Sequence, residues 1–290
     1  MEGIVVKAVG GFYNVRTDDN KMYQCKARGR FKQESLNIFV GDRVYFTQTN
    51  ENEGVVEKVA PKKNRLVRPP IVNVETVIIF FSLKDPPINL LLLDRILVLA
   101  ESNYLEPVIC LNKIDLVKEE EIEAQEIYQS IGYSIILTSA LTGQGVQQVK
   151  ECLKDKISVF TGPSGSGKST FLNRVQPALK LKVGKISSKT RRGKQTTRNV
   201  ELLPFDFGGM VADSPGFSQL DLVDIQSDEL PFLFPEFARI SVNCKFSSCA
   251  HEHEPSCAVK EALERGEINQ SRYKHYLVFL QELREMERSY

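Results

Sequence analysis

The feature that most restricts the fold is a glycine-rich segment, residues 162–169, which reads Gly-Pro-Ser-Gly-Ser-Gly-Lys-Ser. It fits the pattern G-x-x-x-x-G-K-[ST] and stands between a β-rich run at 157–160 and a helical run at 170–175. In that setting backbone N–H groups surround nucleotide phosphates, Lys168 reaches the β- and γ-oxygens, and Ser169 offers its hydroxyl to Mg²⁺. An ordinary glycine turn does not explain a lysine at the start of the helix. The candidate phosphate-binding residues are Gly162, Pro163, Ser164, Gly165, Ser166, Gly167, Lys168, Ser169 and Thr170.

The chain around this loop alternates between strand and helix patterns from residue 74 onward. Residues 74–83 form a continuous β-branched and aromatic run, typical of a parallel strand that is buried on both faces. The alternation predicts a three-layer α/β domain with a mostly parallel sheet, which we assign to residues 64–226. We expect further strands at 107–111, 134–137, 157–160, 200–203 and 209–212, and helices at 88–102, 119–131, 146–153 and 170–175.

Two segments after predicted strands indicate which base is bound. Asn112-Lys113-Ile114-Asp115 follows the strand at 107–111, and a carboxylate there can accept both N1–H and N2–H₂ of guanine, which adenine cannot offer. Asn112 would bond the Hoogsteen edge of the base or a neighbouring loop, and Lys113 would lie over the base. Alone, the segment also fits an Asx turn that caps a helix. The next strand is followed by Ser139 and Ala140, where GTPases place a loop whose backbone N–H contacts guanine O6.

The remaining elements of a GTP site follow the phosphate loop. Asp213-Ser-Pro-Gly216 ends the strand at 209–212, where an aspartate can bind a Mg²⁺-bound water and a glycine N–H can contact the γ-phosphate. Thr196 and Thr197 precede it as candidate switch threonines. Along the chain the two base motifs come first and second, the phosphate loop comes third, and the switch threonines and the D-x-P-G motif come last. That order predicts a circularly permuted GTPase domain, which compact α/β domains tolerate where chain ends lie close together.

The flanking regions have different patterns. Residues 1–63 hold about five short β-rich runs separated by turn residues, which predicts a small barrel such as an OB-fold, although another small barrel or an SH3-like unit fits the same pattern. Phe12, Tyr13, Tyr23 and Phe31 lie among its basic residues and are either base-stacking or core residues. Residues 227–290 are acidic and mostly helical.

Charge and hydropathy exclude several classes of protein. The chain of 290 residues carries 38 basic and 37 acidic side chains, which excludes a histone-like protein. Residues 180–198 hold eight basic residues and no acidic one, so this tract either meets RNA phosphate or forms a solvated face. No apolar run approaches the roughly 18 residues of a membrane span, and we expect a cytosolic protein without a membrane partner.

Three cysteines and a histidine cluster near the C-terminus. Cys244, Cys249, His251 and Cys257 make up a Cys₃His set that can close a tetrahedral Zn²⁺ site, which argues for a structural zinc. His253 is an alternative ligand. The zinc-deaminase pattern H-x-E with P-C-x-x-C is not met, and the remaining alternative is three buried cysteines without metal.

Together these motifs resemble the RsgA family, also called YjeQ or YloQ, over essentially the entire chain. The resemblance implies an OB-fold, including residues 41–44, that contacts ribosomal RNA, and a zinc-binding C-terminal domain with His251 as the ligand. It also implies slow GTP hydrolysis that the small (30S) ribosomal subunit accelerates during late assembly, with release of another assembly factor.

The sequence departs from the family at one position. The family usually has a histidine before the paired threonines, whereas Gln195 stands there in this chain. Phe217 follows the D-x-P-G motif where Ras-type enzymes use a glutamine to orient water. Our hypothesis is that Gln195 orients water when the subunit orders this segment; the alternative is a solvated residue or an altered histidine position with weakened activity.

The sequence therefore predicts a Mg²⁺-dependent GTPase in which Lys168 stabilises phosphoryl charge and Ser169 and a switch threonine, Thr197 or Thr196, bind Mg²⁺. Its expected partners are GTP or GDP and the small subunit with its rRNA, and we expect a monomer. The competing interpretations are a P-loop ATPase or small-molecule kinase and a non-catalytic GTP-gated RNA-binding switch.

Overall fold

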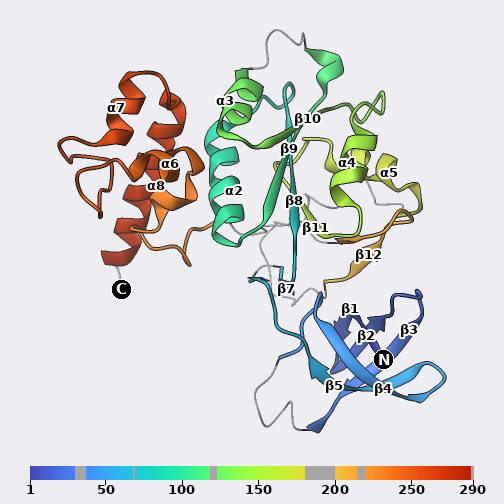
Figure 1. The fold of residues 1–290 in the computed structure, drawn as a ribbon. Helices are drawn as coiled ribbons and strands as arrows, with labels where there is room; N and C mark the ends of the chain where they lie inside the picture. The colour runs from blue at the N-terminus through green and yellow to red at the C-terminus, as the bar shows by residue number, and fades with distance from the viewer. Residues whose placement is uncertain (30–36, 68, 118–122, 180–199, 214–219, 289–290) are drawn as a thin grey trace.

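The computed structural model describes residues 1–29, 37–67, 69–117, 123–179, 200–213 and 220–288 (Figure 1). The N-terminal strands form a closed barrel in the order β1-β2-β3-β5-β4, and the pairing of β1 with β4 completes the ring. β3 and β5 are parallel and the other neighbours are antiparallel, so the predicted OB-type barrel is confirmed. The strands are β1 (Glu2–Val9), β2 (Phe12–Arg16), β3 (Met22–Ala27), β4 (Arg43–Asn50) and β5 (Glu53–Val59).

Alternating residues of the barrel strands point inward. Val15, Tyr23 and Phe46 are buried in the barrel core, and the rings of Tyr23 and Phe46 lie 5.1 Å apart. Tyr23 is therefore a core residue, whereas Phe12 is exposed on the outer face; Phe31 lies outside the described residues. Within the segment 41–44, Asp42 and Val44 are fully buried, and the Asp42 carboxylate accepts a hydrogen bond from the Phe39 N–H at 2.7 Å. The Val44 side chain therefore belongs to the barrel core, and that of Asp42 holds the turn that precedes β4.

The central sheet has the order β10-β9-β8-β11-β13-β12. All neighbouring pairs are parallel except the antiparallel pair β12–β13, which confirms the predicted mostly parallel sheet. Because parallel strands end at the same edge, the loops after β9, β10, β11 and β13 meet there. The strands are β8 (Thr76–Ser82), β9 (Glu106–Asn112), β10 (Ser134–Thr138), β11 (Ile157–Thr161), β12 (Leu202–Pro204) and β13 (Met210–Ala212).

Helices cover both faces of this sheet (Figure 1). Val77, Ile79 and Phe81 of β8 belong to one hydrophobic cluster with α2 and α3, whereas Ile78 and Phe80 belong to another with α4 and α5. This is why β8 is apolar at every position from 77 to 81: both faces of the strand are buried. The helices are α2 (Leu90–Ser102), α3 (Glu123–Ile131), α4 (Val146–Leu153) and α5 (Lys168–Val175).

Some helix boundaries differ from the sequence-based expectation. The helix expected from residue 88 begins at Leu90, because the side chain of Asn89 accepts the Leu92 N–H at 3.0 Å and caps the helix. The helix expected from residue 170 begins two residues earlier, at Lys168. The helix expected over 119–131 is described only from Glu123.

The connection between the barrel and the sheet contains a short β-hairpin. β6 (Arg65–Leu66) and β7 (Ile71–Val72) pair with each other, and Val40 next to the barrel bridges to Ile71. The amide of Asn64 donates to Val74 O at 2.6 Å and accepts from Val74 N at 3.0 Å. The Val72 N–H donates to Val40 O at 3.0 Å, so a backbone hydrogen bond joins this connection to the barrel.

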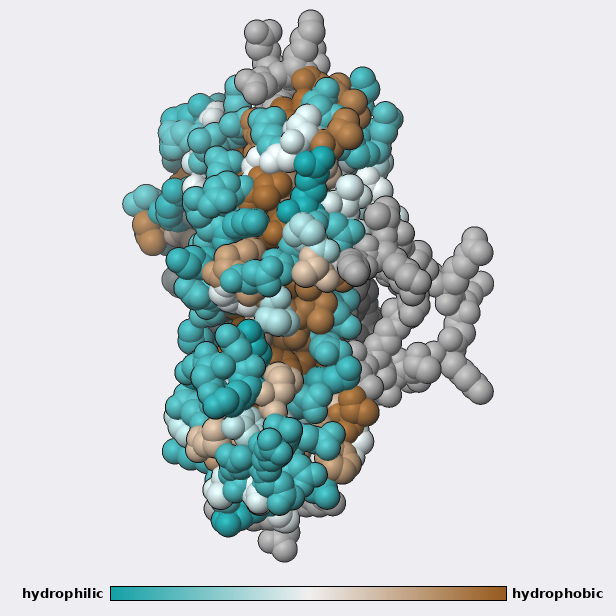
Figure 2. Space-filling model, turned by 90° about the vertical axis from the view of Figure 1, so that its right-hand side faces the viewer, coloured by the Kyte–Doolittle hydropathy of each residue, from teal (hydrophilic) through white to brown (hydrophobic). Residues whose placement is uncertain are grey.

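The C-terminal helices pack against α2 and share its hydrophobic core (Figure 1). Phe234, Tyr276 and Phe279 belong to the same cluster as Leu93 and Leu97 of α2. The view in Figure 2 faces the side opposite these helices, where apolar residues reach the surface as a narrow, interrupted band among polar ones. The elements are a 3-10 helix (Leu230–Leu233), α6 (Pro235–Ser241), α7 (Ala258–Glu264) and α8 (Gln270–Arg288). None of the described helices is long and apolar enough to cross a membrane.

A buried ionic network lies in this shared core. Arg272 of α8 donates to Asp94 of α2 at 2.7 Å and makes two bonds, at 2.8 and 2.9 Å, to the carboxylate of Glu236. Tyr128 donates to Asp94 at 2.6 Å, and His275 contacts its other oxygen at 2.5 Å. Burial lowers the pKa of Arg272, but the two carboxylates outweigh it, so the net shift is upward and the guanidinium stays charged.

Replacing Arg272 should strongly destabilise the protein. The change Arg272→Met leaves two buried carboxylates without their cation, and we expect a loss of about 3–5 kcal/mol in the free energy of unfolding. Urea unfolding followed by circular dichroism measures it. The control is Arg265→Ala, which removes an exposed ion pair with Glu267 and should change stability little. Equal stability of Arg272→Met and the wild type would contradict this role.

Candidate functional site

The glycine-rich segment 162–169 connects β11 to α5, as its sequence predicts. Gly162 has a φ of +127°, and a Cβ there would lie 2.0 Å from Phe80 O. Gly167 has a φ of +92°, and a Cβ there would lie 2.3 Å from the side-chain nitrogen of Asn112. Both positions therefore need glycine for conformation and for space.

Lys168 lies folded back over its own loop. Its ammonium group donates to Gly162 O and Pro163 O, each at 2.7 Å, and to the hydroxyl of Ser166 at 3.3 Å. Only 4% of the residue is exposed, and burial lowers the pKa of Lys168 to about 8. Ser169 follows in the first turn of α5 and is also buried. A poorly solvated ammonium group inside a loop of this shape is suited to bind phosphate oxygens.

Asn112 holds the phosphate loop against the base-binding loop. Its side chain is fully buried at the end of β9, and its amide nitrogen donates to Ser166 O at 2.7 Å. Its amide oxygen accepts from the Ala140 N–H at 3.1 Å and from the Thr138 hydroxyl at 3.3 Å. The sequence allowed Asn112 to contact either the base or a neighbouring loop, and the structure shows its amide in contact with neighbouring loops.

Asp115 lies next to the second base-binding segment. Its carboxylate is exposed and accepts a hydrogen bond from the Ser139 hydroxyl at 2.5 Å, and the same hydroxyl accepts the Thr142 N–H at 3.1 Å. Lys113 has a φ of 66°, and its ammonium group donates to Asp85 O. The structure thus brings both predicted base-binding segments to one edge of the sheet, beside the phosphate loop.

Asp213 ends β13 at the same edge. Its N–H donates to Glu201 O, and its carboxylate accepts the Glu201 N–H, both at 2.9 Å. Glu201, which the sequence alone does not single out, also forms an ion pair with Lys7 of the barrel at 2.6 Å. The other predicted elements lie outside the described residues: the basic tract 180–198 with Gln195, Thr196 and Thr197, and the segment 214–219 with Gly216.

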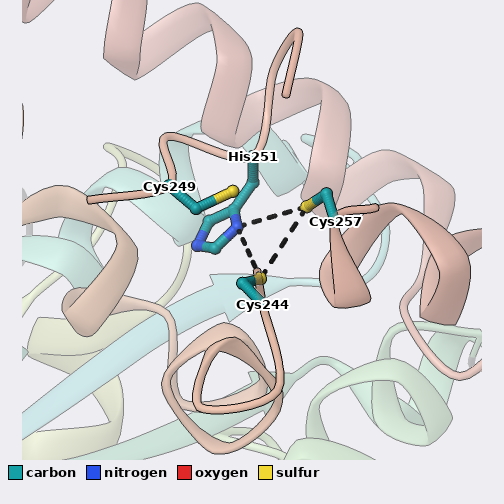
Figure 3. A group of neighbouring side chains, drawn as sticks. All are labelled: Cys244, Cys249, His251 and Cys257. Carbon is teal, nitrogen blue, oxygen red and sulfur yellow. Dashed lines mark hydrogen bonds between the residues drawn. The ribbon is translucent and has the colours of Figure 1, made fainter. Parts of the chain in front are cut away.

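The predicted Cys₃His set forms one cluster (Figure 3). The Nδ1 atom of His251 lies 3.4 Å from the sulfur of Cys257 and 3.7 Å from that of Cys244, and those sulfurs are 4.0 Å apart. All four ligand atoms, including that of Cys249, lie within 4.8 Å of one another. Ligands around a tetrahedral zinc with Zn–S bonds of about 2.3 Å are separated by about 3.8 Å. The cluster therefore fits a tetrahedral metal ion.

His253 does not belong to this cluster. Its side chain is 89% exposed and pairs with Glu252. Two tyrosines of α8, which the sequence alone does not single out, hold the loop that carries His251. Tyr273 donates to His251 O and Tyr276 donates to Ala250 O, each at 2.7 Å. Their spacing of three residues, which places both on one face of a helix, is the sequence signal that could have identified them.

The strand order, the phosphate loop and the two base-binding segments define a P-loop GTP-binding domain whose motifs run in permuted order. The family model for the RsgA GTPase matches residues 59–223, and that for the RsgA N-terminal domain matches residues 2–56. The chain therefore belongs to the RsgA GTPase family of GTP-hydrolysing enzymes, which confirms the resemblance found in the sequence.

Individual relatives match over their full length. A protein of Caldanaerobacter subterraneus subsp. tengcongensis named small ribosomal subunit biogenesis GTPase RsgA is 46% identical over 289 residues, which cover 99% of this chain and 97% of the relative. A Geobacillus protein of the same name is 47% identical, and the match covers 100% of this chain and 99% of the relative. The crystal structure of YjeQ from Thermotoga maritima has a TM-score of 0.86 at 41% identity, with 97% of this chain and 98% of that one covered. The structure of YloQ, described as a circularly permuted GTPase, has a TM-score of 0.84 at 38% identity. The match covers 98% of this chain and 95% of that one.

Nucleotide binding should take up protons. Lys168 in the nucleotide-free chain has a pKa of about 8, and phosphate favours its charged form, so binding raises that pKa. We expect uptake of about half a proton per site at pH 8 and an affinity that falls as the pH rises through 8. Calorimetric titration with GDP in buffers of different ionisation enthalpy measures the uptake. Lys168→Met should remove it, and binding heats that do not depend on the buffer would refute the assignment.

Proposed function

We propose that this chain is an assembly GTPase that binds the small ribosomal subunit late in its maturation and hydrolyses GTP to GDP and phosphate in response. The observation that carries the proposal is the match, over nearly the full length of both chains, to relatives named for small ribosomal subunit biogenesis. Family membership disfavours the ATPase or kinase and the non-catalytic switch. We further infer a monomer that works in the cytosol.

We infer a division of roles among the site residues. Lys168 neutralises charge on the β- and γ-phosphates, and Asp115 and the loop at 139–140 hold the guanine. We assign Ser169 and a switch threonine, Thr197 or Thr196, to Mg²⁺, Asp213 to its water shell and Gly216 to the γ-phosphate. Bound Mg²⁺ neutralises developing charge on the phosphates. GTP favours the subunit-bound state, and hydrolysis favours release.

Small ribosomal subunits should accelerate GTP hydrolysis. We expect a multiple-turnover rate at least about tenfold higher with small subunits than without them, because activation in trans completes the catalytic arrangement. Large subunits serve as the control. Replacing Gln195 with alanine should lower the stimulated rate and leave GTP affinity nearly unchanged, because a water-orienting residue acts only on the chemical step. An unstimulated wild-type enzyme with intact GTP binding would refute the proposed function, and an undiminished rate for Gln195→Ala would remove Gln195 from the mechanism.

Asp115 should determine base specificity. In Asp115→Asn the side chain can accept N1–H and donate to the C2 oxygen of xanthine, whereas the N2 amine of guanine faces a donor. We expect GTP affinity to fall about 10- to 150-fold and xanthosine triphosphate binding to rise. Fluorescence titrations with both nucleotides measure the change, with the wild type as reference. Unchanged GTP affinity would show that Asp115 does not contact the base.

We propose that the Cys₃His cluster holds one structural zinc ion. The donor set of three thiolates and one imidazole suits zinc, and a closed set of four ligands stabilises the loop rather than catalysing a reaction.

Removing a cluster sulfur should remove the metal. We expect about one zinc ion per wild-type chain and little in Cys257→Ser, with earlier thermal unfolding. Elemental analysis of purified protein measures the content. Cys152→Ser is the matched control, because that thiol lies on α4 outside the cluster. Full zinc content in Cys257→Ser, or none in the wild type, would contradict the assignment.

A further inference from the structure

Strand β1 serves both the barrel and the GTPase domain. It pairs with β4 over Glu2–Ile4, and a bulge between Val5 and Lys7 then shifts its register with β2. A bulge bends a strand and re-aims its side chains. Val5 lies in the barrel core, whereas Val6 belongs to the same hydrophobic cluster as Leu202 of β12. The second half of β1 therefore contacts the GTPase domain.

Lys7 of this strand binds the outer edge of the central sheet. β12 is the last strand of that sheet, so one of its edges has no partner within the sheet. Lys7 forms an isolated antiparallel β-bridge with Glu201, which directly precedes β12, and its ammonium group lies 2.6 Å from the Glu201 carboxylate. Glu201 is therefore held from the barrel side by its main chain and by its side chain.

Glu201 holds Asp213 on its other side. The Glu201 N–H donates to the Asp213 carboxylate and the Asp213 N–H donates to Glu201 O, both at 2.9 Å. These bonds continue the β12–β13 ladder, in which Leu202 pairs with Ala212. Burial raises the pKa of the Asp213 carboxyl overall, although the Glu201 N–H and the charge of Lys7 both lower it. Lys7, Glu201 and Asp213 thus form one connected series across the edge of the sheet.

We propose that Lys7 is a positioning residue for the binding of Mg²⁺ with GTP. By fixing Glu201, it fixes the carboxylate of Asp213, which is assigned to the water shell of the ion. The inference rests on the proposed function, since that assignment of Asp213 is part of it. Lys7 acts through Glu201 and lies on the barrel, outside the phosphate loop and both base-binding segments. A barrel residue thus influences how tightly the GTPase domain binds the ion.

The size of the effect follows from the place of Lys7 behind Asp213. Loss of a group that orients a metal-binding side chain commonly weakens metal binding about 10- to 100-fold. Lys7 is one residue further out, and both side chains of its ion pair are 36% exposed, so a smaller effect of about 3- to 10-fold is expected. The alternative is a surface ion pair that only joins the barrel to the sheet, and such a pair would leave Mg²⁺ binding unchanged.

Fluorescence titration of the full-length protein with a labelled, non-hydrolysable GTP analogue tests the proposal. Binding is measured in EDTA and over a range of Mg²⁺ concentrations. In Lys7→Met the affinity in EDTA should match that of the wild type, whereas the Mg²⁺ concentration that gives half of the maximal effect should rise about 3- to 10-fold. Lys7→Arg should restore the wild-type value, because a guanidinium group keeps the ion pair.

Lys63→Met is the matched control. Lys63 forms an ion pair with Glu75 at 3.1 Å, and Glu75 directly precedes β8, at the edge of the sheet opposite the nucleotide site. The variant thus removes another lysine–glutamate pair but no contact to the residues around Asp213. Its Mg²⁺ dependence should stay that of the wild type. Thermal unfolding verifies that every variant is folded.

Asp213→Ala supplies the reference for loss of the carboxylate itself, and it should raise the half-maximal Mg²⁺ concentration more than Lys7→Met does. An unchanged Mg²⁺ dependence in Lys7→Met, an equal change in Lys63→Met, or a matching loss of affinity in EDTA would overturn the role of Lys7. If Asp213→Ala is affected in that case and small subunits still stimulate the wild type, the proposed function stands. An unaffected Asp213→Ala would overturn both the assignment of Asp213 and the role of Lys7.

Discussion

The nucleotide site depends on the buried amide of Asn112. One side chain joins the phosphate loop, through Ser166 O, to the base-binding loop, through the Ala140 N–H. Because the amide is fully buried, each of these bonds satisfies a group that has no access to water. The close approach also explains Gly167, where a Cβ would collide with the Asn112 nitrogen. The geometry of both loops is therefore set before a nucleotide arrives, which reduces the ordering cost of binding.

The C-terminal helices are an extension of the GTPase core rather than an appended unit. Their aromatic residues share one hydrophobic cluster with α2, and Arg272 is bonded to Asp94 on that helix. A small helical region with little core of its own gains stability in this way. Tyr273 and Tyr276 connect the loop of the Cys₃His cluster to α8, so the cluster and the shared core support each other.

Among the described residues, the barrel contacts the GTPase domain through the β6–β7 hairpin and through Lys7. Backbone bonds from the β6–β7 hairpin reach Val40, and the Lys7–Glu201 pair reaches β12 next to Asp213. The barrel is thus in physical contact with the strand pair that ends at Asp213.

The sequence by itself determined the phosphate loop, the alternation of strands and helices, the permuted motif order and the Cys₃His set. Each of these depends on residue type at short spacing, which local stereochemistry and ligand preference constrain. Only the tertiary structure decided the partners of Asn112 and the burial of Asp42. It also revealed the network of Arg272 and the pair of Lys7 with Glu201. The physical reason is distance along the chain: Asn112 and Ser166 are 54 residues apart and Arg272 and Asp94 are 178 apart, so no local pattern records those contacts.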